Sequence, residues 1–98
     1  MPIPEAHQYF CEAEHFEQNG LHQEAVTSYK KAIETDPHFI SAYYNLALLY
    51  HQIQQFDDAI IHLKKVIALD PSNASAMNNL GVILYAIDRF HEAKKYFQ

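Results

Sequence analysis

The sequence is poor in residues that interrupt helices or form covalent links. Only two glycines and four prolines occur among 98 residues, and this scarcity favours long helices over a fold of strands and tight turns. Cys11 is the single cysteine, so no disulfide can form within the chain. A lone thiol fits a reducing compartment, and we expect a cytoplasmic protein.

Two kinds of continuous run are missing as well. No apolar run approaches the roughly 20 residues that span a bilayer, and the N-terminus lacks the basic and apolar segments of a secretory signal. The basic residues form no continuous cluster and the net charge is −5, whereas phosphate backbones attract clustered lysine and arginine. We therefore expect no nucleic acid and no membrane among the partners.

Candidate reactive residues do not combine into a catalytic or metal site. His7, Cys11 and His15 share one face of a predicted helix, but eight residues of helix rise about 12 Å, so all three cannot reach one ion. Glu12 and Glu14, close to Cys11 in sequence, oppose formation of its thiolate. The sequence has no phosphate-binding glycine loop and no nucleophile elbow. We expect no enzyme activity, no metal and no cofactor.

What the chain does contain is a pattern that returns every 34 residues. The recurring residues include Ala25, Ala59 and Ala93, the pairs Asp36-Pro37 and Asp70-Pro71, and Asn45 and Asn79. A fixed period of this length indicates a stack of similar units, each of which contacts its neighbours.

Each unit is predicted to hold two amphipathic helices, because apolar residues recur at steps of three and four. Asn19-Gly20 ends the first helix, and the Asp-Pro pairs end the second and fourth. Ser72-Asn73 is expected to cap the fifth helix. The predicted helices cover about 4–19, 22–35, 41–53, 56–69, 74–87 and 90–98. Their expected inward residues are Tyr9, Ala13, Phe16, Ala25, Val26, Tyr29, Ala32, Ile33, Tyr43, Leu46, Ala47, Tyr50, Ile53, Ala59, Ile60, Leu63, Val66, Ile67, Met77, Leu80, Gly81, Leu84 and Ile87.

The pattern resembles the tetratricopeptide repeat, in which aromatic, leucine and small residues precede a turn and alanines and a proline follow it. Glu12, Val66 and Met77 depart from this pattern. The resemblance implies one all-α domain over 1–98, a right-handed α-solenoid of antiparallel helix pairs with six helices. Its repeats would cover about 6–39, 40–73 and 74–98, the third being truncated.

The resemblance also implies a protein-interaction scaffold that binds a peptide or partner segment in a concave groove lined by the first helix of each repeat. Asn45 and Asn79 occupy equivalent places, where amides can clamp a peptide backbone. A similar ladder occurs in the O-linked N-acetylglucosamine transferase family, although asparagine is also simply common at this place. The candidate groove residues are Phe10, Glu14, Tyr44, Asn45, Leu48, His51, Asn78, Asn79 and Tyr85.

The groove is not expected to grip a C-terminal carboxylate, as chaperone-cochaperone repeat domains do with lysine, asparagine and arginine. Phe10 and Glu14 stand where the first helix would offer lysine and asparagine, and Ser75 and Asn79 replace lysine and arginine. Without cations, a buried carboxylate would lose its hydration uncompensated. Glu14 and Glu17 favour a partner with some basic character instead, although glutamate on a helix face is most often simply solvated.

Two alternatives to a peptide-binding scaffold stay open. The truncated third repeat leaves Ile83, Ile87 and Phe97 as candidates for an exposed end through which the protein could self-associate. The chain could equally be the regulatory or substrate-binding arm of a larger enzyme whose catalytic domain lies beyond Gln98. We expect the chain to be a piece of a longer array, or its open end to be covered by another molecule, since solenoid ends are normally covered by a polar helix.

Overall fold

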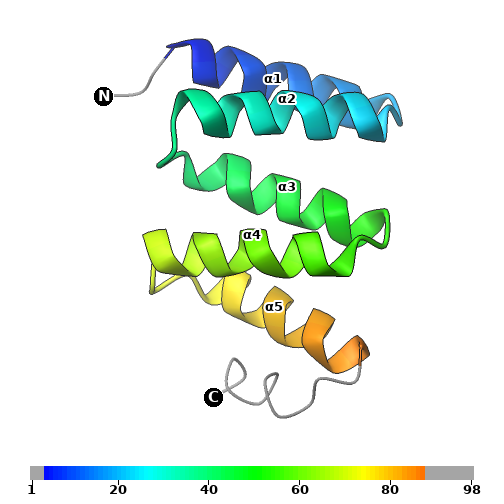
Figure 1. The fold of residues 1–98 in the computed structure, drawn as a ribbon, viewed down its shortest axis with the longest axis vertical. Helices are drawn as coiled ribbons and strands as arrows, with labels where there is room; N and C mark the ends of the chain where they lie inside the picture. The colour runs from blue at the N-terminus through cyan, green and yellow to red at the C-terminus, as the bar shows by residue number, and fades with distance from the viewer. Residues whose placement is uncertain (1–3, 88–98) are drawn as a thin grey trace.

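The computed structural model describes residues 4–87, which form five α-helices and no strand (Figure 1). The sixth predicted helix, over about 90–98, lies outside the described residues, so five helices are seen rather than six. The bounds of α2 and α4 are those predicted from the sequence. The helices are α1 (Pro4–Gln18), α2 (His22–Thr35), α3 (Ile40–Gln52), α4 (Phe56–Leu69) and α5 (Ala74–Ala86).

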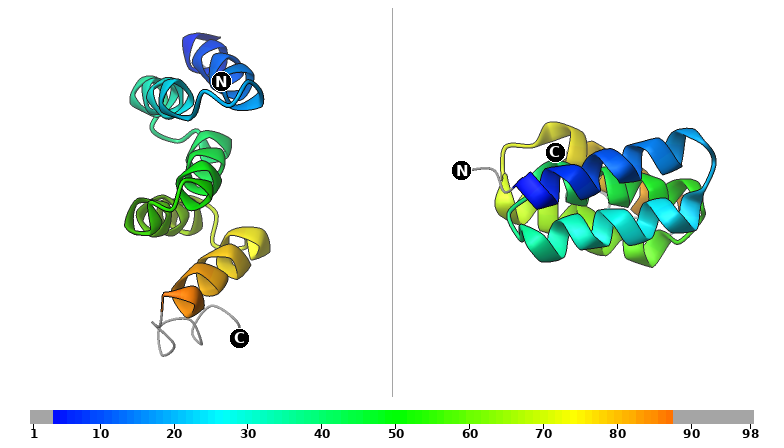
Figure 2. Two further views of the ribbon diagram at one scale, coloured as in Figure 1. Left: turned by 90° about the vertical axis from the view of Figure 1, so that its right-hand side faces the viewer. Right: turned by 90° about the horizontal axis from the view of Figure 1, so that it is seen from above.

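The helices alternate between two layers. Figure 2 shows α1, α3 and α5 on one side of the molecule, here called the inner layer, and α2 and α4 on the other side, here called the outer layer. Helix α1 packs against α2 and α3 packs against α4 as antiparallel pairs, while α2 and α4 each contact the following inner helix. This is the array of antiparallel pairs that the repeat pattern predicts, and it leaves one face of α1, α3 and α5 outside the interlayer core.

The turns inside the two pairs share one backbone conformation. Gly20 has φ +73° and Gln54, its equivalent one repeat later, has φ +64°. Glycine accepts this left-handed conformation freely, whereas a residue with a Cβ atom loses on the order of 1 kcal/mol in it. At the start of α5, the Asn73 side chain accepts a hydrogen bond of 2.9 Å from the backbone N–H of Ala76, which confirms the predicted cap.

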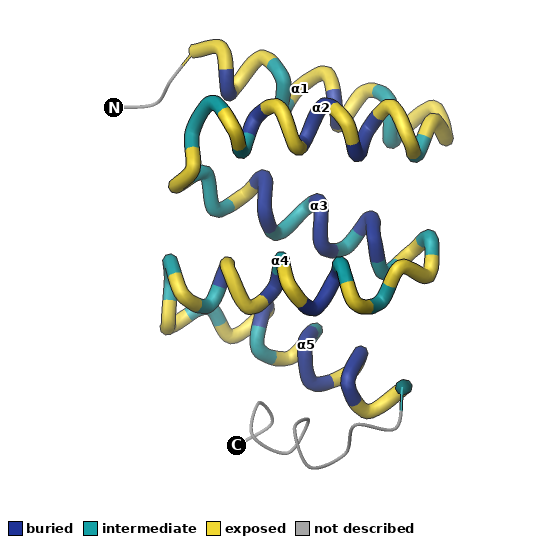
Figure 3. Tube along the Cα trace, viewed as in Figure 1, coloured by how far each residue is buried: buried dark blue, intermediate teal, exposed yellow. Residues whose placement is uncertain are grey.

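The core lies between the two layers and is built around small residues (Figure 3). Ala13 and Ala25 in the first pair, and Ala47 and Ala59 in the second, are fully buried. Small side chains at these positions let paired helix backbones approach closely, as the sequence predicts. Larger side chains fill the remaining space, among them Tyr29, Leu46, Leu49, Leu63, Leu80, Ile83 and Leu84. Seven predicted inward residues are only half-buried, namely Tyr9, Phe16, Ile33, Ile53, Ile67, Met77 and Ile87.

Six buried residues are absent from the predicted core, namely Ala6, Ser28, Ala42, Leu49, Ala76 and Ile83. Leu49 and Ile83 are fully buried and occupy equivalent positions on α3 and α5. The equivalent residue on α1 is His15, which is exposed. This position is therefore apolar on α3 and α5, which each follow a described helix pair. It is polar on α1, which follows no described pair.

The departure at Glu12 has the same physical cause. Glu12 is exposed, whereas its equivalents Leu46 and Leu80 are fully buried. No described helix covers this side of α1, so a carboxylate there keeps its hydration and a leucine would gain nothing from burial. Among the described residues, the side of α1 that carries Glu12 and His15 is therefore polar and exposed.

The predicted exposed end of the third repeat needs a correction. Ile83 is fully buried, because it belongs to the core cluster on α5. Ile87 is half-buried, and Phe97 lies outside the described residues. Self-association through this end stays a prediction, but Ile83 cannot be the residue that mediates it without unfolding.

We expect Ala59→Leu to lower the free energy of unfolding by about 1–3 kcal/mol, because a larger side chain between paired helices forces them apart. Urea denaturation followed by circular dichroism measures this change. Ala68→Leu is the matched control, since Ala68 is exposed on the same helix. Equal stability of the two variants would contradict the close approach at Ala59.

Candidate functional site

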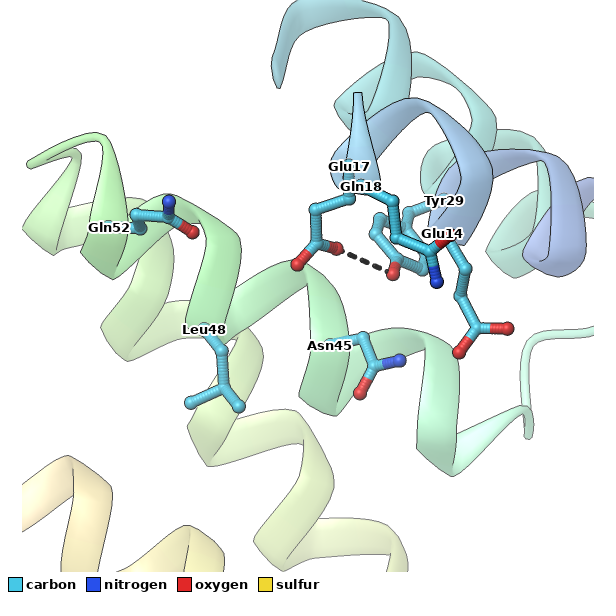
Figure 4. A pocket seen from close by; sticks show the side chains of 7 residues that line it. All are labelled: Glu14, Glu17, Gln18, Tyr29, Asn45, Leu48 and Gln52. Atoms are coloured by element: carbon cyan, nitrogen blue, oxygen red, sulfur yellow. Dashed lines mark hydrogen bonds between the residues drawn. The ribbon is translucent and has the colours of Figure 1, made fainter. Parts of the chain in front are cut away.

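A surface pocket opens between the inner helices α1 and α3 and is here called the α1–α3 pocket. Its volume is about 350 Å³, and Figure 4 shows the side chains that surround it. Two carboxylates and three amides line it, and within residues 4–87 no lysine, arginine or histidine does. The lining residues are Glu14, Glu17, Gln18, Tyr29, Asn45, Leu48 and Gln52.

A second pocket, here called the α3–α5 pocket, lies along the other side of α3 and has a volume of about 250 Å³. Its lining residues in the described part of the chain are all uncharged, namely Ile40, Ser41, Tyr44, Asn45, Asn73 and Ser75. The Asn79 amide on α5 donates a hydrogen bond of 2.9 Å to the Tyr44 hydroxyl on α3. Because Asn45 lines both pockets, the two pockets adjoin along the inner layer.

The buried tyrosine Tyr29 connects the outer layer to the α1–α3 pocket. Its side chain is 1% exposed, and its hydroxyl donates a hydrogen bond of 2.7 Å to the Glu17 Oε1 atom (Figure 4). Burial, followed by the hydrogen bond to Glu17 and the negative charge of Glu17, raises the pKa of the Tyr29 hydroxyl above its ordinary value. The phenol therefore stays protonated at neutral pH and holds the Glu17 carboxylate in place.

The structure brings several of the predicted groove residues together. Glu14, Asn45 and Leu48 line the α1–α3 pocket, and Tyr44 joins Asn45 in the α3–α5 pocket. Asn79 contributes indirectly, through its hydrogen bond to Tyr44. These residues come from three helices that are far apart in sequence, and together they make the inner layer polar at its centre.

Other predicted groove residues lie outside both pockets. Phe10 is half-buried and stacks on Phe39, with 5.0 Å between ring centroids, so its ring is engaged within the fold. The His51 ring lies 5.8 Å from the Phe56 ring, toward the turn between α3 and α4. Two further predicted residues are exposed on α5, namely Asn78 and Tyr85.

The predicted set also omits residues that line the pockets. Glu17 is predicted from the sequence to favour a basic partner, and Tyr29 is predicted to lie in the core. The repeat period contained a usable signal for the others, since Gln18 and Gln52 are equivalent across repeats, as are Ser41 and Ser75. The complete set of omitted lining residues is Glu17, Gln18, Tyr29, Ile40, Ser41, Gln52, Asn73 and Ser75.

Two lysines of the described chain lie against aromatic rings. The Lys31 Nζ atom lies 5.8 Å from the centre of the Tyr9 ring, and Lys65 has the same relation to Tyr43 at 5.9 Å. Cations in this position are attracted by the ring face. These two pairs are equivalent across repeats, so the contact is a recurring feature of the array.

Within residues 4–87, no group of three or more His, Cys, Asp or Glu side chains is placed to hold a metal ion. His7 has its ring 6.4 Å from that of Phe39, and the exposed thiol of Cys11 is free. Among the same residues, no helix is both long enough and apolar enough to cross a membrane.

We expect Tyr29→Phe to lower the free energy of unfolding by about 1–2 kcal/mol, because it removes a hydrogen bond to a carboxylate between α2 and α1. Urea denaturation measures the loss. Tyr9→Phe is the control, because the Tyr9 hydroxyl makes no hydrogen bond within the described residues. A loss of the same size in both variants would contradict the assigned role of the bond.

The same hydroxyl should make stability depend on alkaline pH. Because the pKa of Tyr29 is higher in the folded chain than in the unfolded chain, its contribution is complete below about pH 10 and falls as the pH rises further. The stability difference between wild type and Tyr29→Phe should therefore shrink between about pH 8 and pH 11. Urea denaturation at both pH values tests this, and an unchanged difference would count against it.

Sequence comparison finds the tetratricopeptide repeat three times along the chain. A model described as TPR repeat matches residues 16–54, and two models described as tetratricopeptide repeat match residues 40–73 and 62–95. No curated protein matches the chain significantly.

Solved structures share the fold over nearly the whole chain. Two crystal structures of MamA superpose with TM-scores of 0.91 and 0.89, at 27% identity over 94% of this chain. The chain spans only 54% and 50% of their lengths. The second TPR of Spaghetti (RPAP3), bound to the HSP90 peptide SRMEEVD, superposes with a TM-score of 0.87 at 25% identity over 95% of this chain and 86% of that one. With its repeat matches, its helix pairs and these neighbours, the chain belongs to the tetratricopeptide repeat family.

Proposed function

We propose that this chain is a protein-interaction module that binds an extended segment of a partner protein along the inner faces of α1, α3 and α5. The observation that carries the proposal is the position of Asn45, which lines both pockets of the inner layer. A segment that crosses α3 would pass from one pocket to the other over this residue.

The chemistry of the two pockets suits a peptide backbone. Amide and hydroxyl groups can both donate and accept, so they pair with the N–H and C=O groups of an extended chain irrespective of its sequence. Asn79 is tied to Tyr44, with its amide nitrogen donating to the hydroxyl. We assign the main contact with the backbone to Asn45, and a supporting role to Asn79 and Tyr44, which fix the wall of the α3–α5 pocket.

The comparison with the second TPR of Spaghetti supports a peptide as the ligand, since that structure holds a peptide on the same fold. The lining of the pockets argues against an identical ligand. The HSP90 peptide SRMEEVD carries two glutamates and an aspartate against one arginine. Among the described residues, the α1–α3 pocket is itself acidic and the α3–α5 pocket has no cation. Like charges at such a site would repel the peptide.

Self-association and a role as the arm of an enzyme have less support. The burial of Ile83 removes one of the three residues proposed for a self-association surface. The chain spans about half of the MamA structures. A role as the arm of a longer enzyme therefore stays a proposal. The peptide-binding role depends only on residues within the described helices.

We expect Asn45→Ala to weaken peptide binding by about three- to tenfold, the loss of one or two neutral hydrogen bonds. Ligands are obtained by selecting a phage-displayed library of random dodecapeptides on the wild-type protein. Isothermal titration of the selected synthetic peptides then gives the affinity for each variant.

Ile61→Ala is the matched control, because Ile61 is 61% exposed on α4 in the outer layer. Both variants should keep the wild-type circular dichroism spectrum. If all selected peptides bind Asn45→Ala and wild type equally well, the inner layer is not the binding surface and the proposed function is wrong.

A further inference from the structure

We infer that the α1–α3 pocket receives one basic side chain, arginine or lysine, from the partner segment. This inference rests on the proposed peptide-binding function and specifies the chemistry of the ligand at one position. It makes the groove the electrostatic opposite of a carboxylate clamp.

The charges of the pocket are all of one sign. Glu14 is exposed and Glu17 is half-buried, and both carboxylates border the same opening (Figure 4). Among the described residues, no basic side chain lines the pocket. Lys31 and Lys65 lie over the rings of Tyr9 and Tyr43, which do not line this pocket. A cation from the partner would supply the missing charge.

One of the two carboxylates is held in position before any ligand arrives. The Tyr29 hydroxyl donates to Glu17 Oε1 at 2.7 Å, and the Tyr29 side chain is itself 1% exposed. A carboxylate oxygen has more than one lone pair and Glu17 has a second oxygen, so the bond to Tyr29 leaves acceptor capacity toward the pocket. Fixing the acceptor in advance reduces the entropy lost on binding.

The remaining lining fits the shape of a long basic side chain. Leu48 is half-buried at the pocket and offers an apolar surface for the methylene groups of arginine or lysine. The amide oxygens of Asn45 and Gln52 can accept further N–H donors, of which a guanidinium carries five and an ammonium three. The volume of about 350 Å³ is ample for one such side chain.

The acidic character is confined to one end of the inner layer, which limits the ligand to a single basic position. Glu14 is equivalent to Leu48 on α3 and to Val82 on α5, which is 46% exposed. The α3–α5 pocket has no ionisable side chain other than the Tyr44 phenol. A polybasic run would therefore leave its other charges without partners, whereas one basic residue followed by neutral ones would match both pockets.

The test compares peptides selected from the phage library with variants of the same peptides that lack the basic residue. Arginine is replaced by citrulline, its neutral isostere, and lysine is replaced by norleucine. On wild type, this replacement should weaken binding by about three- to tenfold, as expected for a partly exposed ion pair. On the double variant Glu14→Gln, Glu17→Gln the replacement should have no effect. Glutamine at position 17 still accepts from Tyr29, so the fold is retained, which thermal denaturation checks.

The charge-matched control is Glu24→Gln, Glu34→Gln, which removes two exposed carboxylates from α2 outside both pockets. It should behave as wild type. The inference is overturned if selected peptides that depend on Asn45 show no basic position, or if the citrulline effect persists in the Glu14→Gln, Glu17→Gln variant. If no selected peptide depends on Asn45, the proposed function fails first and the inference fails with it.

Discussion

The close approach of paired helices at fully buried alanines is the constraint on which the rest of this structure depends. Ala13 and Ala25 in the first pair, and Ala47 and Ala59 in the second, are fully buried, so we expect a larger side chain at any of them to push the paired helices apart. Once the pairs are fixed, each inner helix uses one side for the core and has another side free. Both pockets border that free side of α3, which contributes Asn45 to each of them.

Most of the fold could be predicted because each boundary had its own local cause. The ends of α2 and α4 follow from the Asp-Pro pairs, and the end of α1 follows from Gly20, which has φ +73°. Gln54 shows the limit of such local rules, since it adopts the same conformation as Gly20 without being a glycine. Its place in the repeat, rather than its own preference, decides its conformation.

The core and the site were harder to predict where a residue's surroundings come from another unit. Leu49 and Ile83 are buried, while their equivalent on α1 is the exposed His15. The helical period identifies an apolar stripe on one helix. It does not indicate which residues beside that stripe are buried by the helix pair of the preceding repeat. Likewise, nothing in the sequence indicates that the hydroxyl of a core tyrosine, Tyr29, reaches Glu17 twelve positions earlier and extends to a pocket.

A repeat array separates the position of a site residue from its chemistry. The inner-layer position occupied by Glu17 on α1 is occupied by His51 on α3 and by Tyr85 on α5, so the backbone presents the same place three times with different groups. Residues that keep the pattern, such as the alanines, therefore report on packing. Residues that differ at equivalent inner positions are the ones to which we assign recognition of the ligand, because the repeated helix contacts do not require one residue type there. Glu14 and Glu17 are acidic on α1, whereas their equivalents on α3 are Leu48 and His51 and on α5 are Val82 and Tyr85. This difference is the reason why the partner we infer carries its basic residue at one end.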